Sequence, residues 1–567
     1  MKKKYFLVLI LCYFSSFGQK KYPKDYFRNP LDIPIVLAGT FGELRSNHFH
    51  AGFDIKTQRR NGLKIFSAAD GYVSRIKVSI WGYGKALYIT HPNGYTTVYA
   101  HLSKYGKGIE EYVKKIQYKK ESYQTGNIFL KPNQLKVKKG QIVAYSGSTG
   151  GFVAPHLHFE IRDTKTEKVI NPMLFGYLPK DTIAPIFKTL MLYPLDKNSR
   201  INQSNKKRII PLKKVGHNEY VTDRISGSGA IGFGVTVFDR LNGANNKNGI
   251  YSLEMQVNGK RVYYHNVATF SFPESKYINL LIDYPYYKSY KKRLQKTYKV
   301  DRNKLSIYKN LINKGKLTLE KGFNYTVKII AKDFAGNNSV IKIPIVGEKN
   351  NTIFDIPKDT TAYKIVAKNF QKYTNKNVTV AFPKNTFYED IYLDFLVKNG
   401  VAKIHKPNIP LDKKFTLTFD VSTYSEKEKK QLYIANINNK KYPRHYKTIK
   451  KKSKFYTTTK TLGSYTLITD NQKPKVKLYS FKNKQWISNY NLLKVKIHDT
   501  GSGIKSYRAT IDGKWILMEY NLKKKLLTYN FNDKKLEGSK HFFKIVVSDN
   551  VGNTNTLSAT FYRKEKH

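Results

Sequence analysis

Histidines are concentrated in the N-terminal part of this sequence. Six of the 13 histidines precede residue 160, namely His48, His50, His91, His101, His156 and His158. Imidazole binds transition metals and exchanges protons near neutral pH. The clustering therefore predicts a metal site, a proton-transfer site or both in this part of the chain.

The stretch HFHAGFD, residues 48–54, places a carboxylate beside such a histidine. His50 and Asp54 are separated by three residues, and Gly52 between them allows a tight bend. A histidine from elsewhere would complete three protein ligands. Three protein ligands that leave a fourth position for water are typical of catalytic zinc.

The stretch HLHFE, residues 156–160, offers that further histidine. Alternate side chains of a strand share a face, so His156, His158 and Glu160 should point one way. Leu157 should then point toward the core. The residues alone do not choose between the two histidines as the ligand, and two ordinary polar strand positions are the alternative interpretation.

The other residue types available restrict which metal ion the site can bind. Cys12 is the only cysteine, so thiolate ligands, which structural zinc sites and softer metals favour, are missing. An all-oxygen calcium site does not use imidazole. The sequence also lacks His-Glu-x-x-His, so the glutamate base of that peptidase class is absent. The prediction is one catalytic zinc per chain, with the general base supplied by a residue other than the glutamate of such a motif.

Three separated motifs resemble one known family, the lysostaphin-type (LytM-type) zinc endopeptidases that cut peptidoglycan cross-bridges. The motifs are HAGFD at 50–54, YAHLS at 99–103 and HLHFE at 156–160, in the family's order. The flanking pieces FSAADGYV (66–73), YSGSTG (145–150) and APHLHFEI (154–161) are also similar to the family. The resemblance covers about residues 35–175 and says little about residues 181–567.

The resemblance implies a role for each of five residues. The zinc ligands would be His50, Asp54 and His158, and the catalytic pair would be His101 and His156. In this scheme zinc-bound water attacks the peptide carbonyl. The two histidines then act as acid, base or oxyanion stabiliser.

Three further polar residues of this region have less specific interpretations. Glu160 is either a partner that orients a ligand imidazole or a solvated carboxylate at a strand end. His91 precedes an Asn-Gly turn and is interpreted as structural. His48 is interpreted as a structural neighbour of His50.

β-strands must position these residues. Alternating and apolar runs predict strands over 63–68, 71–78, 85–91, 95–101, 137–146 and 156–162, and Pro92-Asn93-Gly94 predicts a hairpin turn. Apolar residues at helical spacing predict an amphipathic helix inserted at about 108–120, namely Ile109, Tyr112, Val113 and Ile116. We expect this helix to border the groove and to shape substrate choice.

The whole chain of 567 residues is predicted to be mainly β and multidomain. An N-terminal β-sandwich or barrel-like peptidase domain (35–180) precedes three β-sandwich, immunoglobulin-like modules at 181–348, 350–470 and 471–567. The first and last modules resemble each other, and each contains Asp-x-x-Gly-Asn, at 333–337 and 549–553. The first module also carries a basic helical insert at about 274–312.

The N-terminus has the pattern of an export signal. Lysines at positions 2–4 precede a short apolar run and the small residues Ser16 and Gly18, so residues 1–18 are predicted to be a signal peptide. The protein is therefore expected in the periplasm or cell envelope, or secreted. With 102 Lys and Arg against 40 Asp and Glu, the net charge of +62 favours polyanions. Export makes an anionic envelope polymer the expected partner rather than nucleic acid, and a compositional habit of the organism is the alternative.

The function predicted from these features is an exported zinc metalloendopeptidase that hydrolyses stem-peptide cross-links in peptidoglycan. One alternative is a secreted peptidase that acts on proteins. The other is a non-enzymatic envelope scaffold or regulator of another murein hydrolase, against which the presence of all five implied site residues argues. The β modules are interpreted as spacers, wall binders or a surface for a regulatory partner protein.

Overall fold

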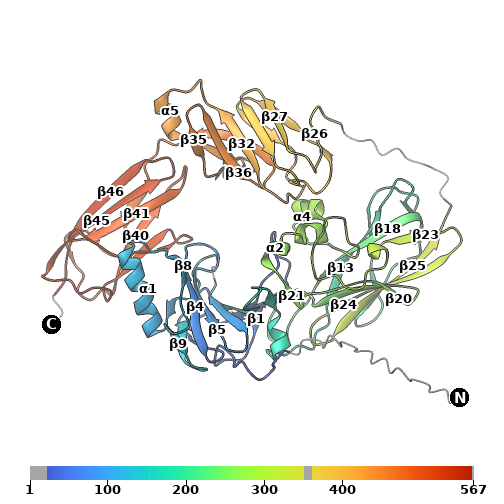
Figure 1. Cartoon of the computed structure of the whole chain (residues 1–567), viewed down its shortest axis with the longest axis horizontal. Coiled ribbons are helices and arrows are strands. Elements are labelled where there is room, and N and C mark those ends of the chain that lie inside the picture. Colours follow the sequence, from blue (N-terminus) through green and yellow to red (C-terminus); the bar gives the residue numbers. More distant parts are fainter. Residues whose placement is uncertain (1–21, 152–153, 350–359, 565–567) are drawn as a thin grey trace, which may run out of the picture.

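The computed structural model describes residues 22–151, 154–349 and 360–564 (Figure 1). The predicted signal peptide at 1–18, with Cys12, lies outside these residues. The protein is mainly β and multidomain, as predicted, because its strands form several separate sheets. Within the described part of the chain, none of the helices has the length and apolar character needed to cross a bilayer.

The N-terminal domain contains one large sheet with the order β1-β2-β11-β6-β5-β4-β8 and a small sheet with the order β3-β10-β7. The strands of the domain are β1 (Leu37–Gly39), β2 (Phe53–Lys56), β3 (Lys64–Phe66), β4 (Gly71–Val78), β5 (Lys85–Thr90), β6 (Tyr95–Ala100), β7 (Lys104–Tyr105), β8 (Gly126–Phe129), β9 (Lys136–Val137), β10 (Ile142–Tyr145), β11 (His156–Asp163) and β12 (Val169–Ile170). A short 3₁₀ helix, η1 (Pro172–Phe175), follows β12.

The middle strands of the large sheet, β5, β6 and β11, are buried along nearly their whole length. Tyr99 and Phe159 belong to the main core, whereas Tyr88 and Val98 form part of a smaller apolar cluster. Side chains of both strand faces are thus covered, which explains the lack of polar alternation in these strands. Gly94, at a φ of 84°, lies in the predicted turn between β5 and β6.

Helix α1 (Lys107–Lys119) lies where the sequence predicts a helical insert. Ile109 and Val113 bury one side of the helix against the core of the N-terminal domain. The other side meets the C-terminal domain, where the ring of Tyr118 lies 5.2 Å from that of Trp515. The expected role of the helix at a substrate groove stays a prediction.

The second domain continues the sheet of the N-terminal domain, because β21 (Thr269–Phe270) pairs with β12. Its own sheet has the order β15-β13-β18-β25-β24-β19-β20. These strands are β13 (Ile186–Pro194), β15 (Arg208–Ile210), β18 (Ile225–Phe238), β19 (Ser252–Val257), β20 (Lys260–Asn266), β24 (Asn324–Lys332) and β25 (Asn338–Gly347).

The basic insert of the second domain contains three short helices, α2 (Phe272–Ser275), α3 (Ile278–Leu281) and α4 (Tyr284–Tyr290). Ile278 and Leu281 belong to the core of the N-terminal domain, and the hydroxyl of Ser275 accepts a hydrogen bond of 2.7 Å from the Phe49 amide. The insert therefore ties the second domain to the segment that contains His50.

The third domain has two five-stranded sheets around one core. Their strands are β27 (Gln371–Asn375), β28 (Val378–Phe382), β32 (Phe415–Asp420), β36 (Lys454–Thr459) and β35 (Ile449–Lys451) in one sheet, and β30 (Phe395–Lys398), β31 (Val401–Ile404), β37 (Gly463–Thr469), β33 (Leu432–Asn436) and β34 (Arg444–His445) in the other. Helix α5 (Glu426–Gln431) begins with a capping box formed by Ser425 and Glu428.

The fourth domain has a four-stranded and a five-stranded sheet around its own core. The strands are β38 (Lys475–Leu478), β40 (Leu492–His498), β44 (Leu526–Asn530) and β43 (Glu519–Asn521), and β39 (Gln485–Trp486), β46 (Thr554–Tyr562), β45 (Lys540–Asp549), β41 (Ile504–Ile511) and β42 (Lys514–Trp515). The domain limits drawn from the sequence stay predictions.

The four domains follow one another around a closed circuit (Figure 1). The insert of the second domain meets the third domain, where the rings of Tyr277 and Tyr388 lie 6.1 Å apart. The fourth domain returns to the first, where Lys85 Nζ lies 2.7 Å from Glu519 Oε1. The N-terminal domain is thus held by contacts from both the second and the fourth domains.

Candidate metal centre

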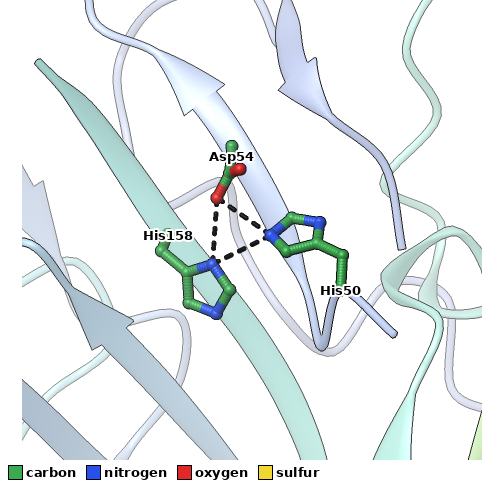
Figure 2. Close-up of side chains that lie close together, drawn as sticks. All are labelled: His50, Asp54 and His158. Carbon is green, nitrogen blue, oxygen red and sulfur yellow. Dashed lines mark hydrogen bonds and ion pairs between the residues drawn. The ribbon is translucent and has the colours of Figure 1, made fainter. Parts of the chain in front are cut away.

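Three side chains, two from the neighbouring strands β2 and β11 and one from the segment before β2, converge at one point of the N-terminal domain (Figure 2). His50 Nε2 lies 3.0 Å from Asp54 Oδ1 and 3.2 Å from His158 Nδ1, and the latter two atoms are 2.9 Å apart. Asp54 on β2 and His158 on β11 are partners in the strand register, which places their side chains on the same face. All three side chains are buried.

The segment before β2 holds His50 in place through its backbone. The His50 amide donates to the Glu43 carbonyl at 2.8 Å, and its own carbonyl accepts from the Gly42 amide at 2.9 Å. A Cβ atom at Gly52 would lie 2.2 Å from the Phe159 carbonyl oxygen. Glycine is therefore required at this position for the close approach of the HFHAGFD segment to β11.

Hydrogen bonds on the far side of each imidazole determine which nitrogen carries the proton. His50 Nδ1 donates to the Thr40 carbonyl at 2.7 Å, because a carbonyl oxygen can only accept. His158 Nε2 lies 2.8 Å from Glu160 Oε1 and donates to that carboxylate in the same way. In its neutral form, each imidazole consequently presents a lone pair to the point where Asp54 Oδ1 also lies. Burial lowers the pKa of His158, but its hydrogen bonds to Asp54 and Glu160 outweigh burial and raise this pKa to about 9, so binding of a metal displaces a proton from the ring.

This donor set fits a transition metal. Two imidazole nitrogens and one carboxylate oxygen form a ligand set that zinc binds with an open fourth position. Burial raises the pKa of the Asp54 carboxyl, but His50 and His158 outweigh burial and hold this pKa well below its ordinary value. Asp54 is thus ionised, as a metal ligand must be.

Glu160 is fully buried behind His158, not solvated. Its carboxylate also accepts a hydrogen bond of 2.7 Å from Arg162 Nε and another from the Tyr83 hydroxyl. Burial raises the pKa of Glu160, but Arg162 and His158 overcome this effect and lower it to about 2. An ionised partner of this kind orients a ligand imidazole and increases its basicity.

Sequence reasoning did not single out Arg45, Tyr83 or Thr40. Arg45 Nη2 lies 3.3 Å from Asp54 Oδ2 and 2.7 Å from Glu43 Oε2. The Tyr83 ring lies 5.0 Å from that of His158. Arg45 stands only five residues before His50 in the chain. Tyr83 lies in the turn before β5 and reaches residues on β11, so its contacts have no local sequence signal.

His101 and His156 lie beside the three converging side chains. Their ring centroids are 4.7 Å apart, and the ring of His101 lies 5.8 Å from that of His158. His101 Nδ1 donates to the Thr149 carbonyl and His156 Nδ1 to the Ala154 carbonyl, each at 2.9 Å. Both rings therefore keep a lone pair on Nε2 in the neutral form.

Burial determines the charge of this second pair of histidines. Burial first, and then the neighbouring imidazoles, lower the pKa of His101 to about 3. Burial also lowers the pKa of His156. Both imidazoles are thus neutral at pH 7 and able to accept a proton. His101 follows β6 at a φ of 60°, a left-handed conformation that is strained for histidine.

The other two histidines of the region lie in different surroundings. His48 is exposed, and its Nδ1 lies 2.8 Å from the Ser46 carbonyl. His91 is buried, with Nδ1 2.8 Å from the Asp70 carbonyl and Nε2 2.8 Å from Thr97 Oγ1. The structure thus brings together the site residues that the sequence proposed, while their roles stay predictions. These residues are His50, Asp54, His101, His156, His158 and Glu160.

Residues 48–118, which include His50, Asp54 and His101, match peptidase family M23. The chain carries a peptidase M23 domain. The LytM-type resemblance seen in the sequence is thereby confirmed. A separate match identifies residues 362–470 as a Zu5-like domain, and these residues form the third domain.

Curated relatives of the M23 domain come from several bacteria. DD-carboxypeptidase/endopeptidase Mpg of Neisseria meningitidis is 32% identical over 119 residues, which are 21% of each chain. Peptidoglycan DD-endopeptidase ShyB of Vibrio cholerae is 33% identical over 112 residues, 20% of each chain. Murein hydrolase activator NlpD of Escherichia coli is 32% identical over 158 residues, 28% of this chain and 32% of that protein.

A zinc-containing peptidase from Vibrio cholerae is among the similar solved structures. It is 27% identical, and the match covers 26% of this chain and 39% of that one with a TM-score of 0.20. The chain spans about a fifth of the length of the Neisseria relative. Each of these matches covers between 20% and 28% of this chain.

Proposed function

We propose that the chain is an envelope metalloendopeptidase that hydrolyses peptide cross-links in peptidoglycan with zinc bound by His50, Asp54 and His158. The observation that supports this proposal best is the convergence of three buried donor atoms beside two neutral imidazoles. The peptidoglycan substrate is inferred from the name of the Vibrio relative. Export by residues 1–18 belongs to the same proposal.

The residues of the chain divide the chemistry between them. When bound, zinc supplies Lewis acidity, which makes water a usable nucleophile near neutral pH and polarises the scissile carbonyl. Glu160 and Thr40 hold the two ligand imidazoles in the tautomers that point their lone pairs inward. Arg45 holds Asp54 Oδ2, which leaves Oδ1 directed at the two histidines.

His101 and His156 perform the proton transfers in this proposal. Each is neutral, and each has Nδ1 bonded to a backbone carbonyl, so Nε2 is the atom that accepts a proton from the attacking water. The protonated ring then returns the proton to the leaving amine or stabilises the oxyanion. The rigid carbonyl partners fix the orientation of the rings, which is what positioned acid–base catalysis needs.

A second candidate function is the regulation of another murein hydrolase, which the name of the Escherichia coli relative suggests. A regulator does not need an intact site. In this chain the three candidate ligands lie within hydrogen-bond distance of one another, and the rings of the two neutral histidines are in contact. The enzymatic proposal is therefore preferred.

The test compares wild type with His158→Ala and His101→Ala on purified peptidoglycan, with zinc content measured in the same samples. His158→Ala should lose both zinc and activity. His101→Ala should keep about one zinc per chain and lose activity roughly 10²–10⁴-fold. His48→Ala is the matched control, because His48 is exposed and next to the same segment, and it should keep both.

Full activity in His158→Ala or His101→Ala would overturn the assignment of the site. Zinc binding without hydrolysis of peptidoglycan by the wild type would favour the regulatory function. Hydrolysis of proteins but not of peptidoglycan would support the alternative of a secreted protein-directed peptidase.

A further inference from the structure

A cluster of three aspartates lies at the junction of the M23 domain and the second domain. Asp181, Asp239 and Asp333 each offer a carboxylate oxygen, and these oxygens lie within 4.8 Å of one another. Asp181 lies in the segment that joins the two domains, Asp239 follows β18, and Asp333 follows β24. No imidazole takes part, so this donor set differs from that of the metal centre.

The same arrangement occurs a second time, at the junction of the third and fourth domains. Asp470, Asp499 and Asp549 also offer carboxylate oxygens within 4.8 Å of one another. In the sequence, both clusters begin with Asp-x-x-x-Pro, at 181–185 and 470–474, and end with Asp-x-x-Gly-Asn. The two clusters therefore belong to the internal repeat.

The local hydrogen bonds repeat as well. The Asn337 side-chain amide donates to the Asp181 carbonyl at 3.3 Å and to Asp333 Oδ2 at 2.7 Å. The Asn553 amide donates to the Asp470 carbonyl at 2.8 Å and to Asp549 Oδ2 at 2.8 Å. Each final asparagine thus holds the first and third aspartates of its cluster together.

The aspartates of the clusters form no ion pairs with basic side chains in the described part of the chain. Although the chain has 102 Lys and Arg against 40 Asp and Glu, no salt bridge joins any of the six aspartates to Lys or Arg within the described residues. Three like charges at such short range are costly when buried and unpaired. Basic residues are abundant, so the lack of such ion pairs leaves the carboxylate oxygens available to a bound cation.

One carboxylate oxygen of the first cluster lacks a hydrogen-bond partner. Asp239 is only 2% exposed, and its Oδ1 is buried without a hydrogen-bond partner. The three aspartates line one cavity of about 20 Å³. A volume of this size holds about one water molecule or one ion.

The electrostatics of the first cluster agree with this geometry. Burial, and then the charge of Asp181, raise the pKa of Asp239 to about 8. Burial also raises the pKa of Asp181 to about 6. In the absence of a cation, the cluster thus resists ionisation of all its carboxyls.

We propose that each of the two aspartate clusters binds one hard divalent cation of the Ca²⁺ class. Carboxylate and backbone carbonyl oxygens are the ligands such cations prefer, whereas zinc prefers the nitrogen-containing set of the metal centre. The neutralising charge explains why no lysine or arginine is needed at either cluster. Each cation would connect residues on both sides of a domain junction.

The first cation also lies near the metal centre. Thr40 lines the same cavity as Asp239, and its carbonyl accepts the hydrogen bond from His50 Nδ1 at 2.7 Å. The Gly249 amide of the second domain donates to Thr40 Oγ1 at 3.2 Å. Cation binding would therefore fix the second domain against the residue that orients a zinc ligand.

The test is calcium titration of the full chain by calorimetry, after removal of all metal and reloading with zinc. Wild type should bind two Ca²⁺ per chain, and Ca²⁺ should raise its unfolding temperature. Asp239→Asn and Asp499→Asn should each lose one Ca²⁺. Asp223→Asn is the matched control, because Asp223 is an exposed aspartate of the second domain, and it should still bind two.

Terbium luminescence provides a second readout for the first site. Tyr251 lines the same cavity, so excitation of tyrosine should sensitise bound Tb³⁺ in wild type, and Asp239→Asn should lose this signal. His158→Ala should keep both Ca²⁺ sites, which separates this proposal from the function of the metal centre. Asp181→Asn replaces Asp239→Asn if the latter does not fold.

The absence of Ca²⁺ binding by wild type would overturn the proposal for both clusters. Unchanged stoichiometry in Asp239→Asn and Asp181→Asn would overturn it for the first cluster. Unchanged stoichiometry in Asp499→Asn would overturn it for the second.

Discussion

At the scale of single residues, the candidate metal centre depends on four hydrogen-bond acceptors that face its imidazoles. The Thr40, Thr149 and Ala154 carbonyls and the Glu160 carboxylate each bind one ring nitrogen and leave the other with a lone pair. Three of these acceptors are backbone atoms, which mutation of a side chain does not remove. Glu160 is the one that mutagenesis can test directly.

Glu160→Gln should weaken zinc binding by about 10- to 100-fold, because a neutral amide is a poorer acceptor for His158 Nε2 than a carboxylate. Zinc affinity measured by competition with a chromogenic chelator checks this expectation. Glu167→Gln is the control, since Glu167 is half exposed and pairs with Arg162 from the solvent side. Equal zinc affinity in Glu160→Gln and wild type would exclude Glu160 as an orienting residue.

At the scale of elements, the site rests on the pairing of β2, β11 and β6. The register places Asp54 and Ala100 on either side of His158, so His101 follows directly after the end of β6. The hairpin of β5 and β6 fixes that end, and His91 holds the hairpin to the loop before β4 through the Asp70 carbonyl. His91 thus contributes to the framework of the site and not to its chemistry.

His91 predicts a pH dependence of stability. Burial lowers its pKa to about 4, so between about pH 6.5 and pH 4 the unfolded chain binds a proton that the folded chain does not. The free energy of unfolding of the M23 domain should therefore fall as the pH falls through this window, by up to about 3 kcal/mol. Above about pH 6.5 this contribution should not change.

Hydrogen exchange of β5 and β6 amides in urea, followed from pH 7 to pH 4, measures this dependence. His91→Gln should lose this part of the slope, even if its stability at pH 7 is lower. His217→Gln, which changes an exposed histidine of the second domain, should leave the slope as it is. Identical slopes in His91→Gln and wild type would contradict the assignment.

At the scale of the whole molecule, the fourth domain closes the circuit by packing on the M23 domain (Figure 1). Trp515 and Leu517 of the fourth domain belong to the apolar core of the first. Ion pairs surround this contact, among them Lys85 with Glu519 and Lys114 with Asp533 at 2.5 Å. A buried tryptophan surrounded by polar pairs is the usual composition of an energetically important interface.

Trp515→Ala combined with Glu519→Ala should open the circuit, because the tryptophan alone is expected to contribute about 2 kcal/mol or more. Small-angle X-ray scattering should then show a larger radius of gyration than that of wild type. Trp486→Ala is the matched control, since Trp486 is an exposed tryptophan of the same domain. An unchanged radius in the double variant would mean that other contacts hold the circuit closed.

Local patterns predicted the parts of the site whose signals lie within short segments. Strand alternation placed His156, His158 and Glu160 on one face, and helical spacing of Ile109 and Val113 located α1 to within one residue at each end. Tyr83 and Thr40 were missed because their contacts join segments distant in sequence or use backbone atoms, whereas Arg45 lies near Asp54 in the sequence but outside the HAGFD motif. The burial of Glu160, which sequence reasoning left open, likewise depends on Tyr83 and Arg162 around it.

The sequence by itself determined the mainly β, multidomain class, the M23 motifs and the internal repeat, because each is a pattern of residue types along the chain. Only the tertiary structure decided which atoms of His50, Asp54 and His158 face one another, since that depends on strand register and on hydrogen bonds to remote carbonyls. It alone also placed the repeated aspartates in two clusters and brought the fourth domain back to the first. Such contacts depend on the packing of whole domains, and no local sequence pattern records them.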